Sequence, residues 1–231
     1  MLRQITFLWH AMRSLVSPKS QSGHNIPISF SIGSVKRYPL LIIPGFGQSV
    51  EGWKKVARLL SISFGVTILE LPNRGRRIFE TKGWTELDFA RYVEKFIKAN
   101  FDKKLILLGH SLGGKTAAIV SIEMKNQITQ LFIYGAGGVR AEIPFMAKIA
   151  TLLKTLFTPV QTTDFENIYK RVPVKTSLIY GEDDLITPKE IGEKIGKLIP
   201  KSTLTIIPKT THLAHEEKPE IFSQVIYKEL K

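Results

Sequence analysis

Short apolar runs alternate with longer helical patterns from about residue 38 to the end of the chain. Continuous apolar strands separated by helices are typical of a parallel sheet that is covered on both faces. The pattern therefore predicts an α/β fold with a mostly parallel sheet. The predicted strands are 40–43, 66–69, 105–108, 131–134, 177–180 and 204–207, with a further candidate at 28–32.

The helical patterns come with recognisable start signals. Thr85 can cap one helix, with Asp88 at its third position. Thr187 and Glu190 frame a second helix start as a capping box, with Pro188 at the first helical position. The predicted helices are 53–62, 85–99, 112–124, 188–198 and a last one that begins at residue 219.

The interval between strands 131–134 and 177–180 is too long for an ordinary crossover connection. Its apolar residues have helical spacing, and we interpret 140–165 as a small helical cap over the strand ends. Met146 and Leu153 are then candidate substrate-binding residues in an apolar acyl pocket. An ordinary pair of surface helices is the alternative. The remaining core would comprise residues 26–139 and 166–231.

Residues 1–25 read as an amphipathic helix followed by a polar linker. Ile5, Leu8, Met12 and Leu15 fall on one helical face, and the apolar run is too short to span a bilayer. No cleavage site typical of a signal peptide is clear. The helix either docks on the body of the protein or makes a weak peripheral contact with an anionic membrane.

Composition narrows the classes of partner. The chain has 231 residues, no cysteine and a net charge of +13. The absence of cysteine excludes disulfides and thiolate metal sites, and we expect no metal and no cofactor. Basic residues are scattered, with only short clusters such as Arg74, Arg76 and Arg77, so we expect no nucleic-acid partner. A cytoplasmic location is expected, and the oligomeric state stays open.

Ligands of open parallel sheets bind beyond the carboxyl ends of the strands, and a G-x-S-x-G sequence stands at one such end. Gly109-His110-Ser111-Leu112-Gly113 follows strand 105–108 directly and opens a helix. A tight turn there lifts the serine hydroxyl clear of the sheet, while the two glycines avoid steric clash. Ser111 is therefore the candidate nucleophile.

A second motif overlaps the first. Residues 109–116 also match G-x-x-x-x-G-K-T, in which Lys115 would meet the phosphates of a nucleotide. A nucleotide-hydrolysing P-loop enzyme is thus a remote alternative, although it leaves His212 without a role.

A serine hydrolase needs an acid and then a histidine after later strands. Of the five histidines, only His212 and His215 follow both the serine and a strand, and His212 is favoured because it stands in the loop. Glu182, Asp183 and Asp184 compete as the acid that orients the imidazole. We select Asp184, with Asp183 as the second choice.

Two backbone N–H groups should stabilise the negative oxygen that forms on the substrate. Leu112, directly after the nucleophile, is expected to supply one of them. Phe46, in the loop after strand 40–43, is expected to supply the other. Gly45 and Gly47 would let this backbone approach the substrate closely.

From about residue 39 onward the chain resembles the α/β-hydrolase superfamily. The resemblance rests on Pro44-Gly-Phe-Gly47, the serine motif, Gly181-Glu-Asp-Asp184 with Pro188, and Glu217-Lys-Pro-Glu220. It implies an α/β-hydrolase fold with a triad of Ser111, Asp184 and His212. The serine motif followed by Gly-Lys looks like that of small carboxylesterases.

The sequence therefore predicts an esterase or lipase that cleaves a small acyl ester through an acyl-Ser111 intermediate. Hydrolysis of amide, peptide or carbon–carbon bonds by the same triad is the alternative. A binding protein on this fold without turnover is a further one.

Overall fold

A computed structural model describes residues 27–34, 38–72, 81, 83–140 and 163–230. Seven strands form one sheet in the order β1-β3-β2-β4-β5-β6-β7. All neighbouring strands pair in parallel except β1 and β3, which are antiparallel. The strands are β1 (Ser29–Ile32), β2 (Tyr38–Ile43), β3 (Phe64–Leu69), β4 (Leu105–His110), β5 (Ile128–Tyr134), β6 (Lys175–Gly181) and β7 (Ser202–Ile207).

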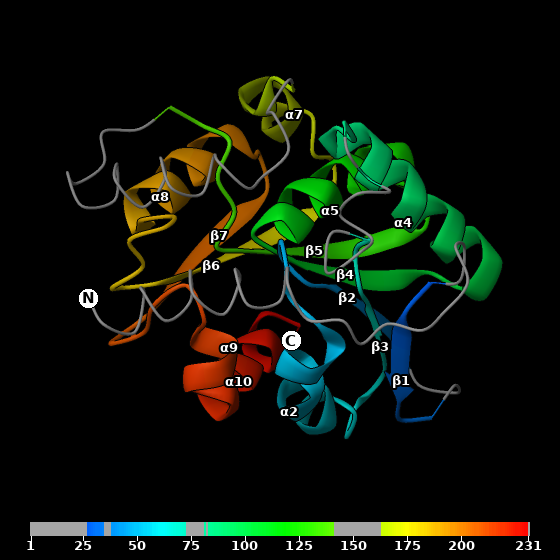
Figure 1. The fold of residues 1–231 in the computed structure, drawn as a ribbon. Helices are drawn as coiled ribbons and strands as arrows, with labels where there is room; N and C mark the ends of the chain where they lie inside the picture. The colour runs from blue at the N-terminus through cyan, green and yellow to red at the C-terminus, as the bar shows by residue number, and fades with distance from the viewer. Residues whose placement is uncertain (1–26, 35–37, 73–80, 82, 141–162, 231) are drawn as a thin grey trace.

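Helices cover both faces of this sheet (Figure 1). One face carries α4 (Glu86–Asn100), α5 (Leu112–Glu123), α7 (Phe165–Lys170) and α8 (Lys189–Leu198), and the other α2 (Val50–Leu60), α9 (Ala214–Glu217) and α10 (Pro219–Glu229). The predicted α/β-hydrolase fold, with a mostly parallel sheet between two helical layers, is confirmed.

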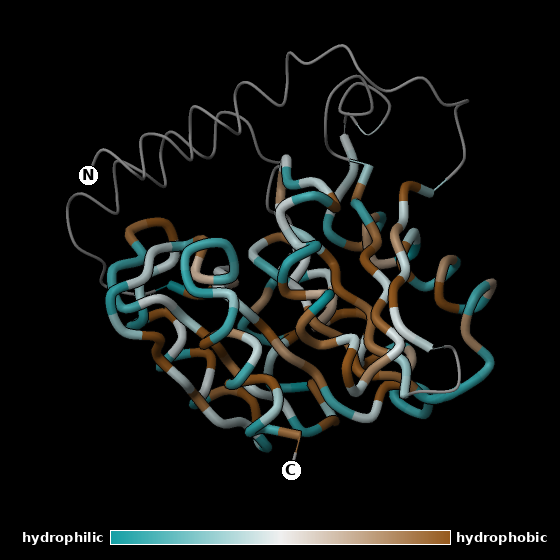
Figure 2. The backbone as a smooth tube through the Cα atoms, turned by 90° about the horizontal axis from the view of Figure 1, so that it is seen from below, coloured by the Kyte–Doolittle hydropathy of each residue, from teal (hydrophilic) through white to brown (hydrophobic). Residues whose placement is uncertain are grey.

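Two apolar cores separate the sheet from its helical layers. In Figure 2 the apolar residues gather in the interior of the molecule. Strand β4 is buried along its whole length, because helices cover both of its faces. Its side chains alternate between the cores: Leu107 faces the core under α4 and α5, whereas Leu108 faces the core under α2. The chemistry that follows β4 therefore stands on the most enclosed part of the sheet.

The two predicted helix starts had different outcomes. Thr85 and Asp88 form the capping box expected of them at the start of α4. The box predicted for Thr187 and Glu190 is wrong: Pro188 is the N-cap of α8, and no side chain caps it. The Thr187 hydroxyl instead contacts Asp184 Oδ2 at 2.8 Å and the carbonyl of Gly135 at 3.0 Å, so it serves the acid and not the helix start.

Several predictions fall outside the described residues. The amphipathic segment 1–25, the arginines at 74, 76 and 77, and most of the predicted cap at 140–165 lie there, including Met146 and Leu153. In the part of the chain that is described, no helix has the length and hydrophobicity that crossing a bilayer requires.

Candidate active site

Ser111 occupies a strained turn between β4 and α5. Its φ of 52° lies in the left-handed region that non-glycine residues rarely adopt. The turn also needs both neighbouring glycines. A Cβ atom on Gly109 would lie 2.2 Å from the carbonyl oxygen of Gly113, and one on Gly113 would lie 2.2 Å from that of Ile43. The G-x-S-x-G spacing is thus a steric requirement of this turn.

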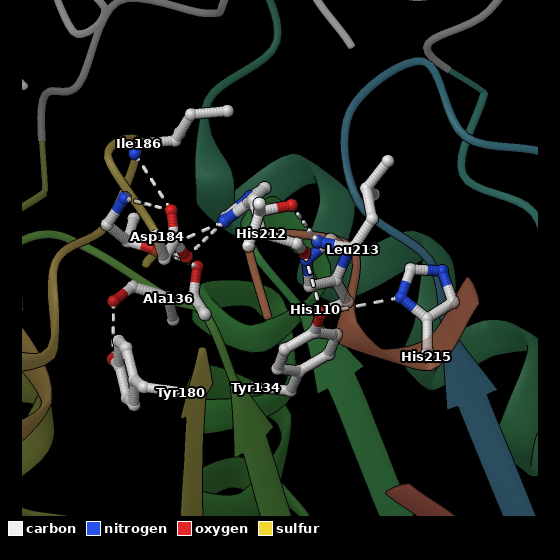
Figure 3. Close-up of polar contacts among 12 residues, drawn as sticks. His110, Tyr134, Ala136, Tyr180, Asp184, Ile186, His212, Leu213 and His215 are labelled. Carbon is white, nitrogen blue, oxygen red and sulfur yellow. Dashed lines mark hydrogen bonds and ion pairs between the residues drawn. The ribbon is translucent and has the colours of Figure 1, made fainter. Parts of the chain in front are cut away.

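His212 and Asp184 meet at the carboxyl ends of β5 and β6 (Figure 3). His212 Nδ1 lies 2.7 Å from Asp184 Oδ2, and both side chains are buried. The imidazole also lies against Gly135, the residue after β5, since a Cβ atom there would be 3.1 Å from His212 Cε1. Because the Ser111 N–H donates to the carbonyl of Tyr134, the serine and the imidazole share the end of β5.

Four hydrogen-bond contacts hold the Asp184 carboxylate. Its Oδ1 accepts from the backbone N–H groups of Ile186 and Thr187, at 2.8 and 2.9 Å. The Thr187 hydroxyl lies 2.8 Å from Oδ2, on the side where His212 also approaches. An acid held in this way keeps one orientation toward the imidazole. Asp183, the second choice from the sequence, is exposed and its N–H donates to the carbonyl of Thr210.

The side chains of Tyr134 and His110 hold the backbone carbonyl of His212. The Tyr134 hydroxyl donates to the His212 carbonyl at 2.6 Å, and His110 Nε2 lies 3.0 Å from the same oxygen. Burial raises the pKa of Tyr134 well above its usual value, so its hydroxyl keeps the proton that it donates. The His110 and Tyr134 rings stack with their centroids 4.3 Å apart.

His215, the competing histidine, lies on the other side of this cluster. It is completely buried, and its ring stacks on Trp53 at 4.0 Å between centroids. Burial, and secondarily His212, lowers its pKa to about 3. An imidazole that stays neutral through the neutral pH range and packs on an indole suits a structural role. The geometry thus favours His212 as the base.

The loop after β2 approaches the serine. A Cβ atom on Gly45 would lie 3.1 Å from Ser111 Cβ. Gly45–Gln48 forms a turn with the Gln48 N–H donating to the Gly45 carbonyl, and Gly47 has the positive φ that such a turn requires. The Gly45 N–H itself donates to the Gln48 side chain, so Phe46, the next residue, stays the candidate donor of this loop.

The Leu112 N–H belongs to the first turn of α5, where helix N–H groups have no partner within the helix. Leu112 directly follows Ser111, and the Gly45–Gln48 turn approaches Ser111 from the end of β2. Both expected oxyanion donors thus belong to segments next to the nucleophile.

Lys115 does not point toward a phosphate site. Its ammonium forms a buried ion pair with Glu86, with Nζ 2.7 Å from Oε1, and lies 4.8 Å from the centre of the Phe165 ring. A P-loop lysine has to be available for phosphates. The geometry therefore disfavours the nucleotide-hydrolysing alternative.

Sequence reasoning missed four residues that support the site, namely Gln48, His110, Tyr134 and Thr187. The sequence points to Thr187 only as a helix cap, although its place three residues after Asp184 is a usable signal. The other three act through contacts between residues far apart in the chain, such as the 2.7 Å contact from Gln48 to His110.

Comparisons with known proteins agree with this architecture. A family model described as alpha/beta hydrolase fold matches residues 38–136. The crystal structure of an alpha/beta hydrolase enzyme from the sediment metagenome of the lagoon of Mar Chica, Morocco, superposes with a TM-score of 0.73 at 24% identity. The match covers 90% of this chain and 95% of that one.

Two curated relatives with different reactions match most of the chain. One is the 2-hydroxy-6-oxo-6-(2'-aminophenyl)hexa-2,4-dienoic acid hydrolase of Metapseudomonas resinovorans, which is 24% identical over 90% of this chain and 91% of its own. The other is the pimeloyl-[acyl-carrier protein] methyl ester esterase of Wigglesworthia glossinidia brevipalpis, 25% identical over 81% of this chain and 91% of its own.

Proposed function

The chain belongs to the α/β-hydrolase superfamily, and from that premise we propose that it hydrolyses carboxylic esters through an acyl intermediate on Ser111. The observation that carries the proposal is the buried Asp184–His212 pair, which shares the end of β5 with a serine on a strained turn. Similarity to an ester hydrolase adds support.

In the first half of the proposed reaction, Ser111 Oγ attacks the acyl carbonyl while His212 Nε2 takes the hydroxyl proton. Asp184 accepts a hydrogen bond from His212 Nδ1, which keeps the proton on Nδ1, so that Nε2 acts as the base, and which stabilises the imidazolium. The N–H groups of Phe46 and Leu112 stabilise the oxyanion. His212 then returns the proton to the leaving alcohol, and the acyl group stays on Ser111.

In the second half, water attacks the acyl-enzyme. His212 takes a proton from this water, and the same two N–H groups stabilise the second oxyanion. Collapse releases the carboxylic acid and returns the proton to Ser111. Each proton that His212 takes is given back within the same half-reaction, so the free enzyme is regenerated.

A panel of nitrophenyl esters from acetate to long-chain acyl groups tests this proposal. Wild-type protein should release nitrophenol, and Ser111→Ala should lose that activity while it keeps its folded circular dichroism spectrum. Undiminished hydrolysis by Ser111→Ala would contradict the role of the serine.

Carbon–carbon bond hydrolysis is the second candidate, because the Metapseudomonas resinovorans relative is named for a dienoic acid substrate. A 2-hydroxy-6-oxo-dienoic acid offered beside the ester panel separates the two reactions. A kcat/KM for the dienoic acid that exceeds every ester value would assign the chain to this second reaction. Peptide or amide hydrolysis is tested in the same way with anilide analogues of the esters.

A further inference from the structure

The side-chain amide of Gln48 lies between the loop after β2 and the turn that carries Ser111. Its Oε1 accepts a hydrogen bond from the Gly45 N–H at 2.7 Å, and the Trp53 indole N–H approaches it at 3.4 Å. His110 Nδ1 lies 2.7 Å from the same oxygen. When Nδ1 carries the ring proton, His110 donates it to this amide oxygen, which can only accept. One atom thus joins the loop, helix α2 and the residue before Ser111.

These contacts determine where the loop presents its next donor. The Gly45 N–H is directed to Gln48, and Phe46, the proposed oxyanion donor, is the next residue of the same turn. The same amide oxygen also contacts His110, the residue directly before the nucleophile. The distance between the Phe46 N–H and Ser111 therefore depends on Gln48.

We propose that Gln48 is a positioning residue that fixes the oxyanion loop relative to Ser111 through the Gly45 N–H and His110. This inference rests on the proposed hydrolase function. A misplacement of about 1 Å can cost on the order of 100-fold in rate, because oxyanion donors act only at short range. The turn alone does not supply this accuracy, since its own hydrogen bond from the Gln48 N–H to Gly45 is long, at 3.3 Å.

Gln48→Met tests the proposal because methionine has a similar length and cannot replace the amide as an acceptor for these N–H groups. We expect kcat to fall by about 10- to 100-fold while KM changes less than about threefold, since ground-state binding does not use the oxyanion donors. The acid limb of the kcat/KM pH profile should keep its midpoint, because the Asp184–His212 pair is untouched. Gln48→Glu, which restores an acceptor, should retain more activity than Gln48→Met.

Gln130→Met is the matched control. Gln130 is buried, and its Nε2 donates to the Glu229 carbonyl at 3.1 Å, near the start of β5 and away from the serine. Its loss should lower the melting temperature without lowering kcat. A similar fall in kcat for both glutamine variants would reduce Gln48 to a stabilising residue and overturn the proposal.

Exchange of the Gly45 amide proton, followed by NMR, supplies a readout that needs no activity. The proton should exchange at least about tenfold faster in Gln48→Met than in wild type, because its acceptor is gone. Unchanged exchange, or faster exchange with unchanged kcat, would overturn the positioning role of Gln48 and leave the proposed hydrolase function standing. A wild-type chain that neither cleaves esters nor reacts with a fluorophosphonate would overturn the proposed function, and the positioning role with it.

Discussion

Two buried acid–base pairs stand at the carboxyl side of the sheet, and they have nearly the same geometry. Asp184 and His212 lie 2.7 Å apart in the loops after β6 and β7, and Glu86 and Lys115 lie 2.7 Å apart between α4 and α5. Distance and burial therefore do not distinguish a catalytic pair from a structural one.

The difference lies in what each pair can do with a proton and in what lies next to it. An imidazole can take and return a proton as a general base, whereas the Lys115 ammonium serves as one half of an ion pair. His212 contacts His110, the residue before Ser111. Lys115 instead borders the Phe165 ring, and Glu86 accepts from the Thr163 hydroxyl. We interpret the first pair as catalytic and the second as an anchor between helices.

The largest effect is expected from a substitution that removes the charge of Asp184 but keeps the shape of its side chain. Asp184→Asn should lower kcat by up to about 10⁴-fold, because the amide favours the imidazole tautomer whose Nε2 carries a proton. The melting temperature should change far less than activity. Steady-state ester hydrolysis and thermal unfolding measure the two effects, and a variant with near wild-type kcat would remove Asp184 from the mechanism.

Breaking the Glu86–Lys115 pair should lower stability strongly and activity little. Glu86→Gln leaves the Lys115 ammonium without a counter-ion in a largely buried position, and we expect about 3 kcal/mol of lost unfolding free energy. The kcat of the folded fraction should stay within about threefold of wild type. Denaturant titration measures the first quantity.

A double variant completes this test. Glu86→Gln combined with Lys115→Met removes the uncompensated charge and should recover most of the lost stability. If Glu86→Gln abolishes activity in protein that remains folded, the proposed distinction between the pairs fails.

The pH dependence of the unfolding free energy tests the different roles of His212 and His215. The folded pKa of His215 is lowered to about 3, so the unfolded chain binds this proton near pH 6.5 and the folded chain does not. His215 therefore stabilises the fold fully above pH 6.5, and the contribution is lost as pH falls toward 3. Between pH 6.5 and pH 5 the loss should be about 2 kcal/mol.

His215→Phe should remove this slope, because phenylalanine can keep the stacking on Trp53 without binding a proton. Urea unfolding at several pH values measures it, and kcat at neutral pH should be largely retained. A dead His215→Phe beside an active His212→Ala would exchange the roles of the two histidines.

The smallest expected effect concerns the hydroxyl that supports Asp184. Thr187→Val removes the hydroxyl contacts to Asp184 Oδ2 and to the Gly135 carbonyl at nearly constant volume. It should lower kcat by about tenfold, the equivalent of one hydrogen bond to a charged group. Thr187→Ser keeps the hydroxyl and should stay closer to wild type. Equal kcat for both variants and wild type would show that the backbone N–H groups alone hold the carboxylate.

Much of the fold and the core of the candidate site were predictable because they depend on local sequence. The apolar runs specify the strands, and the glycine spacing specifies the turn at Ser111. The choice between Asp183 and Asp184 depends on the orientation of their turn. That orientation involves the hydrogen bond from the Asp183 N–H to the carbonyl of Thr210 in another loop, which the local sequence does not reveal. Gln48 could not be foreseen because its partner His110 is 62 residues away.

Covalent trapping tests the central claim most directly, because it asks whether Ser111 is the activated nucleophile. Wild-type protein treated with a fluorophosphonate should gain one adduct by intact-mass spectrometry, and peptide mapping should place it on Ser111. Ser111→Ala should gain none, and Asp184→Asn should react far more slowly. An unlabelled wild type, or a Ser111→Ala variant that labels at the wild-type rate, would contradict the account.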